Sequence, residues 1–189
     1  MFEEKKLSKK NVLFIIGSKS FRDEEYFIPF EILQKEGATI TTASSIEGEV
    51  VGVEGGEARS TLTLKQINTK NFDIIIFVGG DGASEYFENN DAHKIIQEAV
   101  AKHKVLAAIC IAPVILAKAG VLKGRKATVW SSLMNKSGAK ELKEAGCNVE
   151  DKRVVIDGKI VTADGPAVAK EFAEAIIVAF LSKEDEEES

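Results

Sequence analysis

Three uninterrupted apolar runs constrain the fold of this chain more than any other feature. They occupy residues 11–17, 73–78 and 104–109, and each is followed by small residues and then by a helical pattern. A short apolar run without alternation is typical of a strand that is covered on both faces, as in a parallel sheet. Such strands alternating with helices predict an α/β fold, with a mostly parallel sheet between two helix layers.

The rest of the chain completes this alternation. Asp157 and Gly158 form a turn signal between two short apolar runs, which predicts a hairpin. Residues 49–63, rich in glycine and β-branched residues, predict a small hairpin or an excursion. The predicted helices cover residues 23–37, 90–102, 111–119, 137–146 and 166–181, and the further strands cover residues 38–43, 125–130, 154–156 and 160–162.

The 189 residues are predicted to form a single domain, because no repeat and no linker divides residues 11–181. Residues 1–10 are predicted to be an N-terminal extension. Residues 182–189 contain one lysine and five acids, so they carry −4 of the formal net charge of −5. A terminal run of like charges is typical of a solvated tail, and we expect this segment to be disordered.

Charge and hydropathy argue against two classes of partner. The body of the protein is close to neutral and has no basic stripe that would bind nucleic acid. No run approaches the ~18 apolar residues that a membrane span needs. The two cysteines, Cys110 and Cys147, form no Cys-x-x-Cys pair, which favours free thiols in a reducing compartment. We therefore expect a cytoplasmic protein.

Cys110 is the strongest candidate for a reactive residue. It follows the third apolar run, and the small residues Ala108 and Ala112 lie two positions before and after it. A nucleophile elbow needs small residues at these two positions, because the backbone turns sharply between strand and helix. A cysteine at the start of a helix also has its pKa lowered by unpaired N–H groups. The alternative is a buried cysteine that packs as a small hydrophobe.

Two further turns follow predicted strands. Gly79 and Gly80 follow the second apolar run, where their N–H groups could line an anion pocket or simply form a tight turn. Residues 17–20, Gly-Ser-Lys-Ser, follow the first run and could bind phosphate or a flavin. Neither segment matches a dinucleotide or nucleoside-triphosphate motif, so we predict no cofactor.

Glu25 lies in the first turn of the first predicted helix. Its carboxylate could complement the helix dipole, or it could face the Cys110 sulfur. In the second case the two groups would titrate together, because two adjacent anions repel each other. The two histidines, His93 and His103, both precede Cys110 and are expected to lie at the surface or to cap a helix. A Cys-His pair would need one of these two or a histidine from another subunit.

Metal binding has no support in the sequence, because no cluster of histidine, cysteine and carboxylate residues has ligand spacing. Cys147 follows an Ala-Gly pair at a predicted strand start and is interpreted as structural.

Four segments carry a resemblance to a known family: DEEYFIPFEILQKEG, IIIFVGGDGASEYF, VLAAICIAPVILAKAGVLKGRKAT and VIDGKIVTADGP. In this order and spacing they resemble the ThiJ/PfpI superfamily, also called the DJ-one family, which has a class I glutamine amidotransferase-like fold. The resemblance implies a flavodoxin-like α/β/α sandwich that forms a homodimer or a larger homo-oligomer. It also implies that Cys110 is the nucleophile, that Glu25 contacts its sulfur, and that backbone N–H groups of Gly79, Gly80 and Ile111 bind an oxyanion.

The departures from the family pattern reduce the number of activities that are expected of this chain. PfpI-type proteases carry histidine directly after the cysteine, where this chain has Ile111, so a peptidase is disfavoured. The DJ-one branch has another histidine near the pocket, and the matching position here is Trp130, a predicted pocket residue. The His-x-Glu pair of glutamine amidotransferases is absent near the C-terminus of the sequence.

The leading hypothesis is an enzyme of the glyoxalase or deglycase type. The Cys110 thiolate would add to a reactive aldehyde such as methylglyoxal or to a glycated substrate, and Glu25 would shuttle the proton. The alternative from another class is a redox sensor without turnover, in which Cys110 oxidises to a sulfinic acid beside protonated Glu25. A binding module that uses residues 17–20 is the third hypothesis.

Overall fold

The computed structural model describes residues 5–182, which form one seven-stranded sheet with helices on both faces. The strand order is β10-β11-β7-β6-β1-β2-β5, and every neighbouring pair is parallel except β10 and β11. The five central strands, in the order β2-β1-β6-β7-β11, have the flavodoxin-like arrangement. The strands are β1 (Asn11–Ile15), β2 (Thr39–Ser44), β5 (Leu62–Thr63), β6 (Ile74–Phe77), β7 (Val105–Ile109), β10 (Val154–Asp157) and β11 (Ile160–Ala163).

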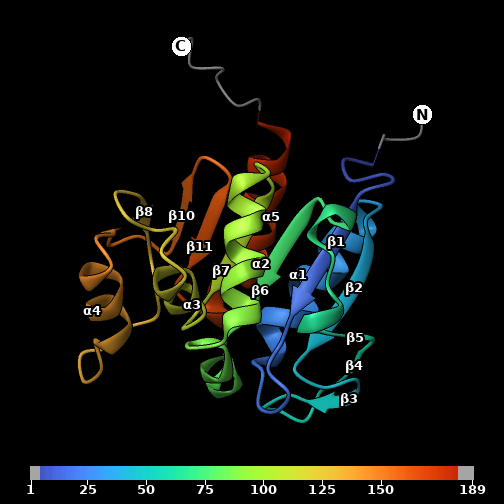
Figure 1. Cartoon of the computed structure of the whole chain (residues 1–189), viewed down its shortest axis with the longest axis horizontal. Helices are drawn as coiled ribbons and strands as arrows, with labels where there is room; N and C mark the ends of the chain where they lie inside the picture. The colour runs from blue at the N-terminus through green and yellow to red at the C-terminus, as the bar shows by residue number, and fades with distance from the viewer. Residues whose placement is uncertain (1–4, 183–189) are drawn as a thin grey trace.

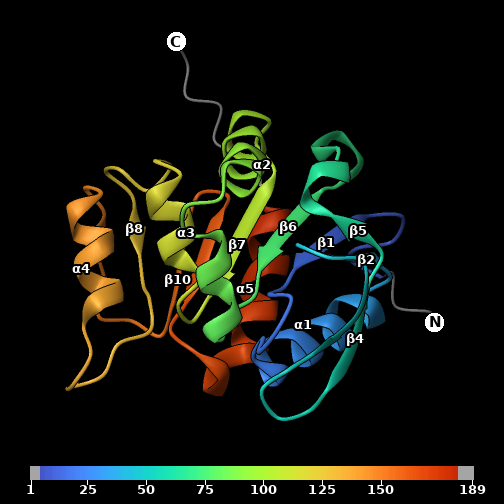
Figure 2. The ribbon, with the colours of Figure 1, turned by 60° about the horizontal axis from the view of Figure 1, so that its bottom comes forward.

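Helices cover both faces of this sheet, as Figures 1 and 2 show. Helices α1 and α5 pack against each other on one face, and α2 and α3 pack together on the other. The helices are α1 (Asp23–Lys35), α2 (Asn90–Ala101), α3 (Pro113–Lys118), α4 (Ser137–Glu144) and α5 (Ala169–Leu181). The predicted three-layer α/β architecture is confirmed.

The apolar runs form the centre of the sheet because both faces of each strand are buried. Along β1, Val12 and Phe14 face the α1–α5 layer, whereas Leu13 and Ile15 face the α2–α3 layer. Successive side chains of a strand point to opposite faces, so a strand between two helix layers must be apolar at every position. This double burial places the strand ends rigidly, and the candidate site lies at their carboxyl ends.

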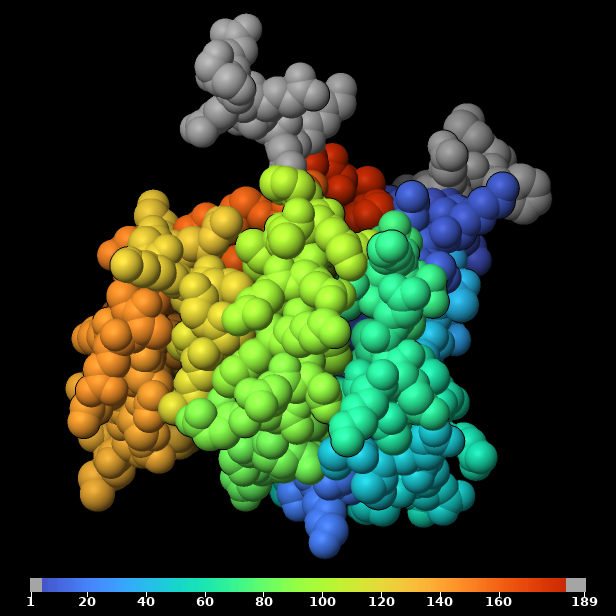
Figure 3. Space-filling view, viewed as in Figure 1, coloured from blue at the N-terminus to red at the C-terminus, as the bar shows by residue number. Residues whose placement is uncertain are grey.

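Two small sheets flank the main one. The predicted hairpin in residues 49–63 is present, with β3 (Gly48–Val51) antiparallel to β4 (Glu57–Ser60). On the other side, β8 (Lys126–Ala127) pairs with β9 (Asn148–Val149) beside α4. In Figure 3, α2 is the light green ridge in the middle of the visible face, with the yellow segment that includes α3 on one side and the blue-green segment of residues 64–71 on the other.

Several predicted elements are shorter in the structure, and two of them adjoin the candidate site. The strand expected over residues 125–130 ends at Ala127, because Thr128 N–H donates to the Thr162 hydroxyl and Trp130 N–H donates to the carbonyl oxygen of Cys110. The helix expected over residues 111–119 begins only at Pro113. Residues 110–112 form the turn that separates this helix from β7.

The described part of the predicted N-terminal extension packs against the body of the protein. Within the predicted N-terminal extension, Leu7 is fully buried and its N–H donates to the carbonyl oxygen of Glu36. Most of the predicted acidic tail lies outside the described residues, so its disorder stays a prediction. No helix in residues 5–182 has the length and apolarity to cross a bilayer.

Candidate active site

Cys110 lies at a sharp turn after β7, with a backbone φ of +64°. A positive φ is uncommon for a residue other than glycine, and such strain is concentrated at functional sites. The turn is held from both sides, because Cys110 N–H donates to Ala163 at 2.9 Å and its carbonyl oxygen accepts from Trp130 N–H at 2.8 Å. Ala108 and Ala112 are fully buried on either side of the turn. The local geometry is therefore that of a nucleophile elbow.

Glu25 reaches the same place from the first turn of α1. Its side chain is fully buried, and its Oε2 accepts a hydrogen bond from Gly79 N–H at 2.9 Å. Its Oε1 is buried and makes no hydrogen bond of good geometry. The remaining polar neighbour of the carboxyl group is the Cys110 thiol, with which it interacts directly. A buried carboxylate with so few donors is costly, so this carboxyl group favours its protonated form.

Gly79 allows these two side chains to meet. A Cβ at this position would lie 2.5 Å from Glu25 Oε2 and 2.6 Å from Cys110 Cβ, so no larger residue fits. Its N–H is already donated to Glu25, which departs from the expectation that it would serve an oxyanion. The N–H groups of Gly80 and Ile111 instead donate to the Cys110 sulfur. Of the three predicted backbone donors, Gly80 and Ile111 face the reacting atom.

The pKa values of both ionisable groups are raised. Burial raises the pKa of Glu25 to about 7, against the hydrogen bonds from Cys110 and Gly79, which lower it. Burial, and then the charge of Glu25, raise the pKa of the Cys110 thiol. The expected lowering of the Cys110 pKa by a helix N-terminus is therefore wrong. Helix α3 is short and begins three residues after the cysteine, and burial dominates the pKa of the thiol.

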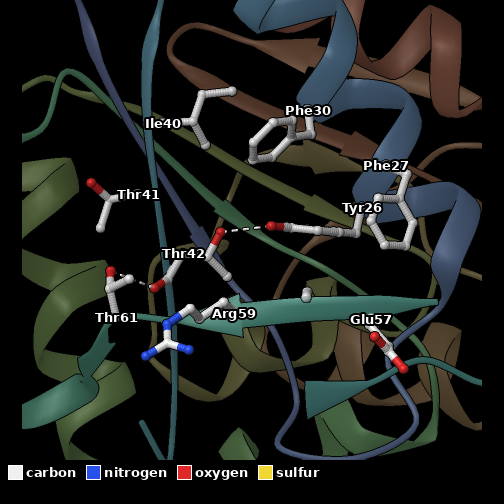
Figure 4. A pocket seen from close by; sticks show the side chains of 10 residues that line it. Tyr26, Phe27, Phe30, Ile40, Thr41, Thr42, Glu57, Arg59 and Thr61 are labelled. Atoms are coloured by element: carbon white, nitrogen blue, oxygen red, sulfur yellow. Dashed lines mark hydrogen bonds between the residues drawn. The ribbon is translucent and has the colours of Figure 1, made fainter. Parts of the chain in front are cut away.

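Aromatic packing fixes the helix that carries Glu25. Tyr26, the next residue, donates or accepts a 2.7 Å hydrogen bond with the Thr42 hydroxyl and packs edge-on against Phe14 and Phe21. Figure 4 shows Tyr26 and Phe30 projecting from α1 into a cavity of about 370 Å³ beside β2 and β4. Because the helix is anchored on this side, Glu25 on its other side has a defined position.

The Cys110 sulfur opens into a cavity of about 660 Å³. Trp130 lines it, as predicted, whereas neither His93 nor His103 does. His93 Nε2 is instead 2.8 Å from the carbonyl oxygen of Phe87. Sequence reasoning missed several lining residues, although Arg22 and Asp81 are close in sequence to Glu25 and Gly80. The cavity is lined by Arg22, Glu25, Val53, Gly80, Asp81, Ser84, Phe87, Cys110, Ile111, Trp130, Asn135, Ser137 and Pro166.

At the turn of residues 17–20, the donors of Ser18 already have a partner within the protein. Glu85 occupies it, with Oε1 accepting from Ser18 N–H at 2.6 Å and Oε2 accepting from the Ser18 and Ser45 hydroxyls at 3.0 Å. A Cβ at Gly17 would lie 2.8 Å from the backbone of Gly82, so this corner is closely packed. The third hypothesis therefore receives no support from Ser18 and stays a prediction.

Cys147 provides an internal contrast to Cys110. Its side chain is buried, and its Sγ lies 3.3 Å from the carbonyl oxygen of Arg125. Within residues 5–182 no group of three histidine, cysteine or carboxylate residues could hold a metal ion.

A flavodoxin-like sheet that ends in a strained cysteine turn beside a buried glutamate defines a class of cysteine-elbow α/β proteins. Residues 10–179 match the model of the DJ-1/PfpI family, and the chain belongs to this family.

The relatives cover most of the chain. An uncharacterized protein of Methanocaldococcus jannaschii is 39% identical, and the match covers 93% of this chain and 86% of the relative. A deglycase of Pyrococcus horikoshii is 32% identical over 82% of this chain and 90% of its own length. A ThiJ/PfpI domain protein of Brachyspira murdochii superposes with a TM-score of 0.86 at 27% identity, covering 91% of this chain and 96% of the other.

Proposed function

We propose that this protein is a cysteine-dependent enzyme of the glyoxalase or deglycase type, acting on reactive 2-oxoaldehydes or their adducts. The observation that carries the proposal is the pairing of Cys110 with Glu25 in a cavity large enough for a small substrate. Relatives at about 30% identity that are named deglycases support the same class of substrate.

The two side chains form the minimal set for this reaction. When the pair carries one negative charge, the proton resides either on sulfur or on the Glu25 carboxylate, and the form with a thiolate and a carboxylic acid is reactive. The N–H groups of Gly80 and Ile111 stabilise this thiolate. An ordinary Cys-His pair is not required, because Glu25 takes the place of the base.

With methylglyoxal as substrate, the thiolate attacks the aldehyde carbon and the new alkoxide takes the proton of Glu25, giving a hemithioacetal. The Glu25 carboxylate then removes the proton on that carbon and returns one to the neighbouring carbon. The hydroxyl proton of the hemithioacetal passes to the former ketone oxygen, which leaves a lactoyl thioester on Cys110. Water hydrolyses the thioester to lactate and frees the thiol. The overall reaction adds one water and needs no oxidant.

For a glycated amine, the same thiolate would attack the adduct carbon, and Glu25 would protonate the departing amine. A homodimer or larger homo-oligomer belongs to this proposal, because the resemblance to the family implies one.

The test is methylglyoxal consumption and lactate formation by Cys110→Ser, with Cys147→Ser as the matched control. We expect loss of at least about 100-fold in the first variant and wild-type rates in the second. Aldehyde consumption that survives in Cys110→Ser would refute the proposal. Wild-type protein that consumes no aldehyde, yet whose Cys110 oxidises faster than Cys147 under dilute peroxide, would identify the redox sensor instead.

A further inference from the structure

Acidic residues outnumber basic ones among the described residues that line the cavity. Of the described residues that line it, Arg22 is the one with a permanent positive charge, and Glu25 and Asp81 are acidic. Sequence reasoning assigned no role to Arg22 or Asp81. An arginine beside a reactive thiol could in principle bind the carboxylate of a substrate, because its planar guanidinium group pairs with carboxylates through two hydrogen bonds.

Arg22 is not available for that role, because the protein supplies its own carboxylates. Glu24 Oε2 accepts from Arg22 Nε at 2.9 Å, and Glu24 Oε1 accepts from Nη2 at 3.2 Å. Glu54 Oε1 lies 3.8 Å from Nη1. The guanidinium group is therefore paired with one carboxylate and adjacent to a second, so the group of three carries a net negative charge.

The position of Glu54 is built into the fold. The loop that joins β3 and β4 is held to α1 by Asp23, whose carboxylate accepts from Glu54 N–H at 2.8 Å and from Gly56 N–H at 2.6 Å. Asp23 is itself buried. The same loop places Val53 in the wall of the cavity. Glu54 thus reaches Arg22 from a fixed loop rather than from a mobile one.

Two aromatic side chains form another part of the cavity lining. Trp130 and Phe87 line the cavity, and the backbone of Trp130 is tied to the carbonyl oxygen of Cys110. The face of an indole ring attracts cations. The aromatic part of the lining therefore favours a cation over an anion.

We propose that this cavity selects its substrates by charge, admitting neutral and cationic carbonyl compounds to Cys110 and repelling those that carry a carboxylate. Glu24 and Glu54 mask Arg22, and Asp81 adds a further negative charge at the start of the turn after Gly80. The inference rests on the proposed function for its substrates, but the charge selection itself is a property of the cavity. Neutral 2-oxoaldehydes and adducts on basic side chains are the substrates that fit, and 2-oxo acids are excluded.

The selection can be measured without turnover by using three methanethiosulfonate reagents that share one reactive group and carry a positive, a neutral or a negative substituent. The Cys110 thiolate displaces sulfinate and forms a mixed disulfide, which mass spectrometry quantifies. The Cys147→Ser background limits labelling to Cys110, and rates are normalised to those of a small free thiol. We expect the cationic reagent to react fastest and the anionic reagent slowest, with the gap narrowing at high salt.

The variants Glu24→Gln and Glu54→Gln unmask Arg22, and each should raise the relative rate of the anionic reagent about twofold to fivefold. Asp81→Asn should act in the same direction. Glu31→Gln is the matched control, because Glu31 is exposed on the same helix, two turns beyond Glu24 and outside the cavity. It should leave the charge order unchanged.

The inference would be overturned if the three reagents reacted at equal normalised rates or if none of them labelled Cys110. It would also be overturned if Glu31→Gln raised the relative rate of the anionic reagent as much as Glu24→Gln and Glu54→Gln do. Charge selection in a protein that turns over no aldehyde would contradict the proposed function and leave the cavity property standing. If turnover occurs, the ratio of kcat/KM for glyoxylate to that for methylglyoxal should rise in Glu24→Gln by the same factor as the labelling ratio. An unchanged ratio would count against the selection of substrates.

Discussion

Two glutamates, Glu25 and Glu85, lie at the carboxyl ends of neighbouring strands. They differ in the number of hydrogen bonds that the protein donates to their carboxylates. Glu85 accepts three hydrogen bonds, from the Ser18 N–H and from the hydroxyls of Ser18 and Ser45. Glu25 is fully buried and accepts one backbone hydrogen bond, from Gly79. Both side chains close a corner of the same sheet, but only Glu25 has a buried carboxylate oxygen that accepts no hydrogen bond of good geometry.

The difference separates a structural carboxylate from a reactive one. At Glu85 the donors compensate the charge, so the residue ties two loops together. At Glu25 the missing donors make the charge costly, so the carboxyl group holds its proton until the pH reaches about 7. A group with this pKa can both give and take a proton near neutral pH, which is what an acid-base residue needs.

The largest expected effect is the loss of activity in Glu25→Gln. Glutamine keeps an acceptor for Gly79 N–H but cannot transfer a proton, so we expect kcat for methylglyoxal to fall about 100-fold to 10,000-fold. Glu85→Gln is the matched control and should retain activity within about threefold. Similar losses in the two variants would remove the distinction between the two glutamates.

The second effect is on the pH dependence of stability. The folded-state pKa of Glu25, about 7, lies above its ordinary value of 4.5, so folding favours the protonated form. Its contribution to stability is complete below pH 4.5 and is lost as the pH rises through 7, by about 3 kcal/mol. Denaturant unfolding between pH 4 and 8 should show this loss in the wild type and in Glu85→Gln, and not in Glu25→Gln. An identical pH profile in all three proteins would show that Glu25 ionises normally.

The smallest expected effect concerns Glu85. Replacing it with alanine removes three acceptor contacts at a solvent-accessible corner, which should lower the free energy of unfolding by about 1 kcal/mol. The alkylation rate of Cys110 should not change, because Glu85 does not line the cavity. A large change in that rate would show that the two corners are coupled.

Much of the fold follows from the sequence because the central strands are buried on both faces. A continuous apolar run of this length fits few structures other than a strand covered on both faces. The hairpins at Gly158 and in residues 49–63 are marked by glycine and other turn residues in the sequence. The strand expected over residues 125–130 is shorter because its backbone bonds to distant partners such as Thr162, and the helix expected from residue 111 begins later because Cys110 bonds to Ala163. Such pairings have no local pattern.

The candidate site could also be predicted only in part from the sequence. Ala108 and Ala112 identify the Cys110 turn locally, whereas the approach of Glu25 required the resemblance to a family. The hydrogen bond between Glu25 and Gly79 joins residues 54 positions apart, so the sequence did not reveal that this N–H is occupied. The ion pair between Arg22 and Glu54 also joins residues that are far apart in the sequence, so no local pattern predicts it.

The central claim is that Cys110 and Glu25 titrate as one unit, and the pH dependence of iodoacetamide alkylation tests it most directly. Rates at Cys110 and Cys147 would be read separately by peptide mass spectrometry, in the wild type and in Glu25→Gln. We predict that the alkylation rate of Cys110 has an inflection near pH 7, which Cys147 does not share and which disappears in Glu25→Gln. A pH profile of Cys110 without this inflection, or an inflection that survives in Glu25→Gln, would contradict the account.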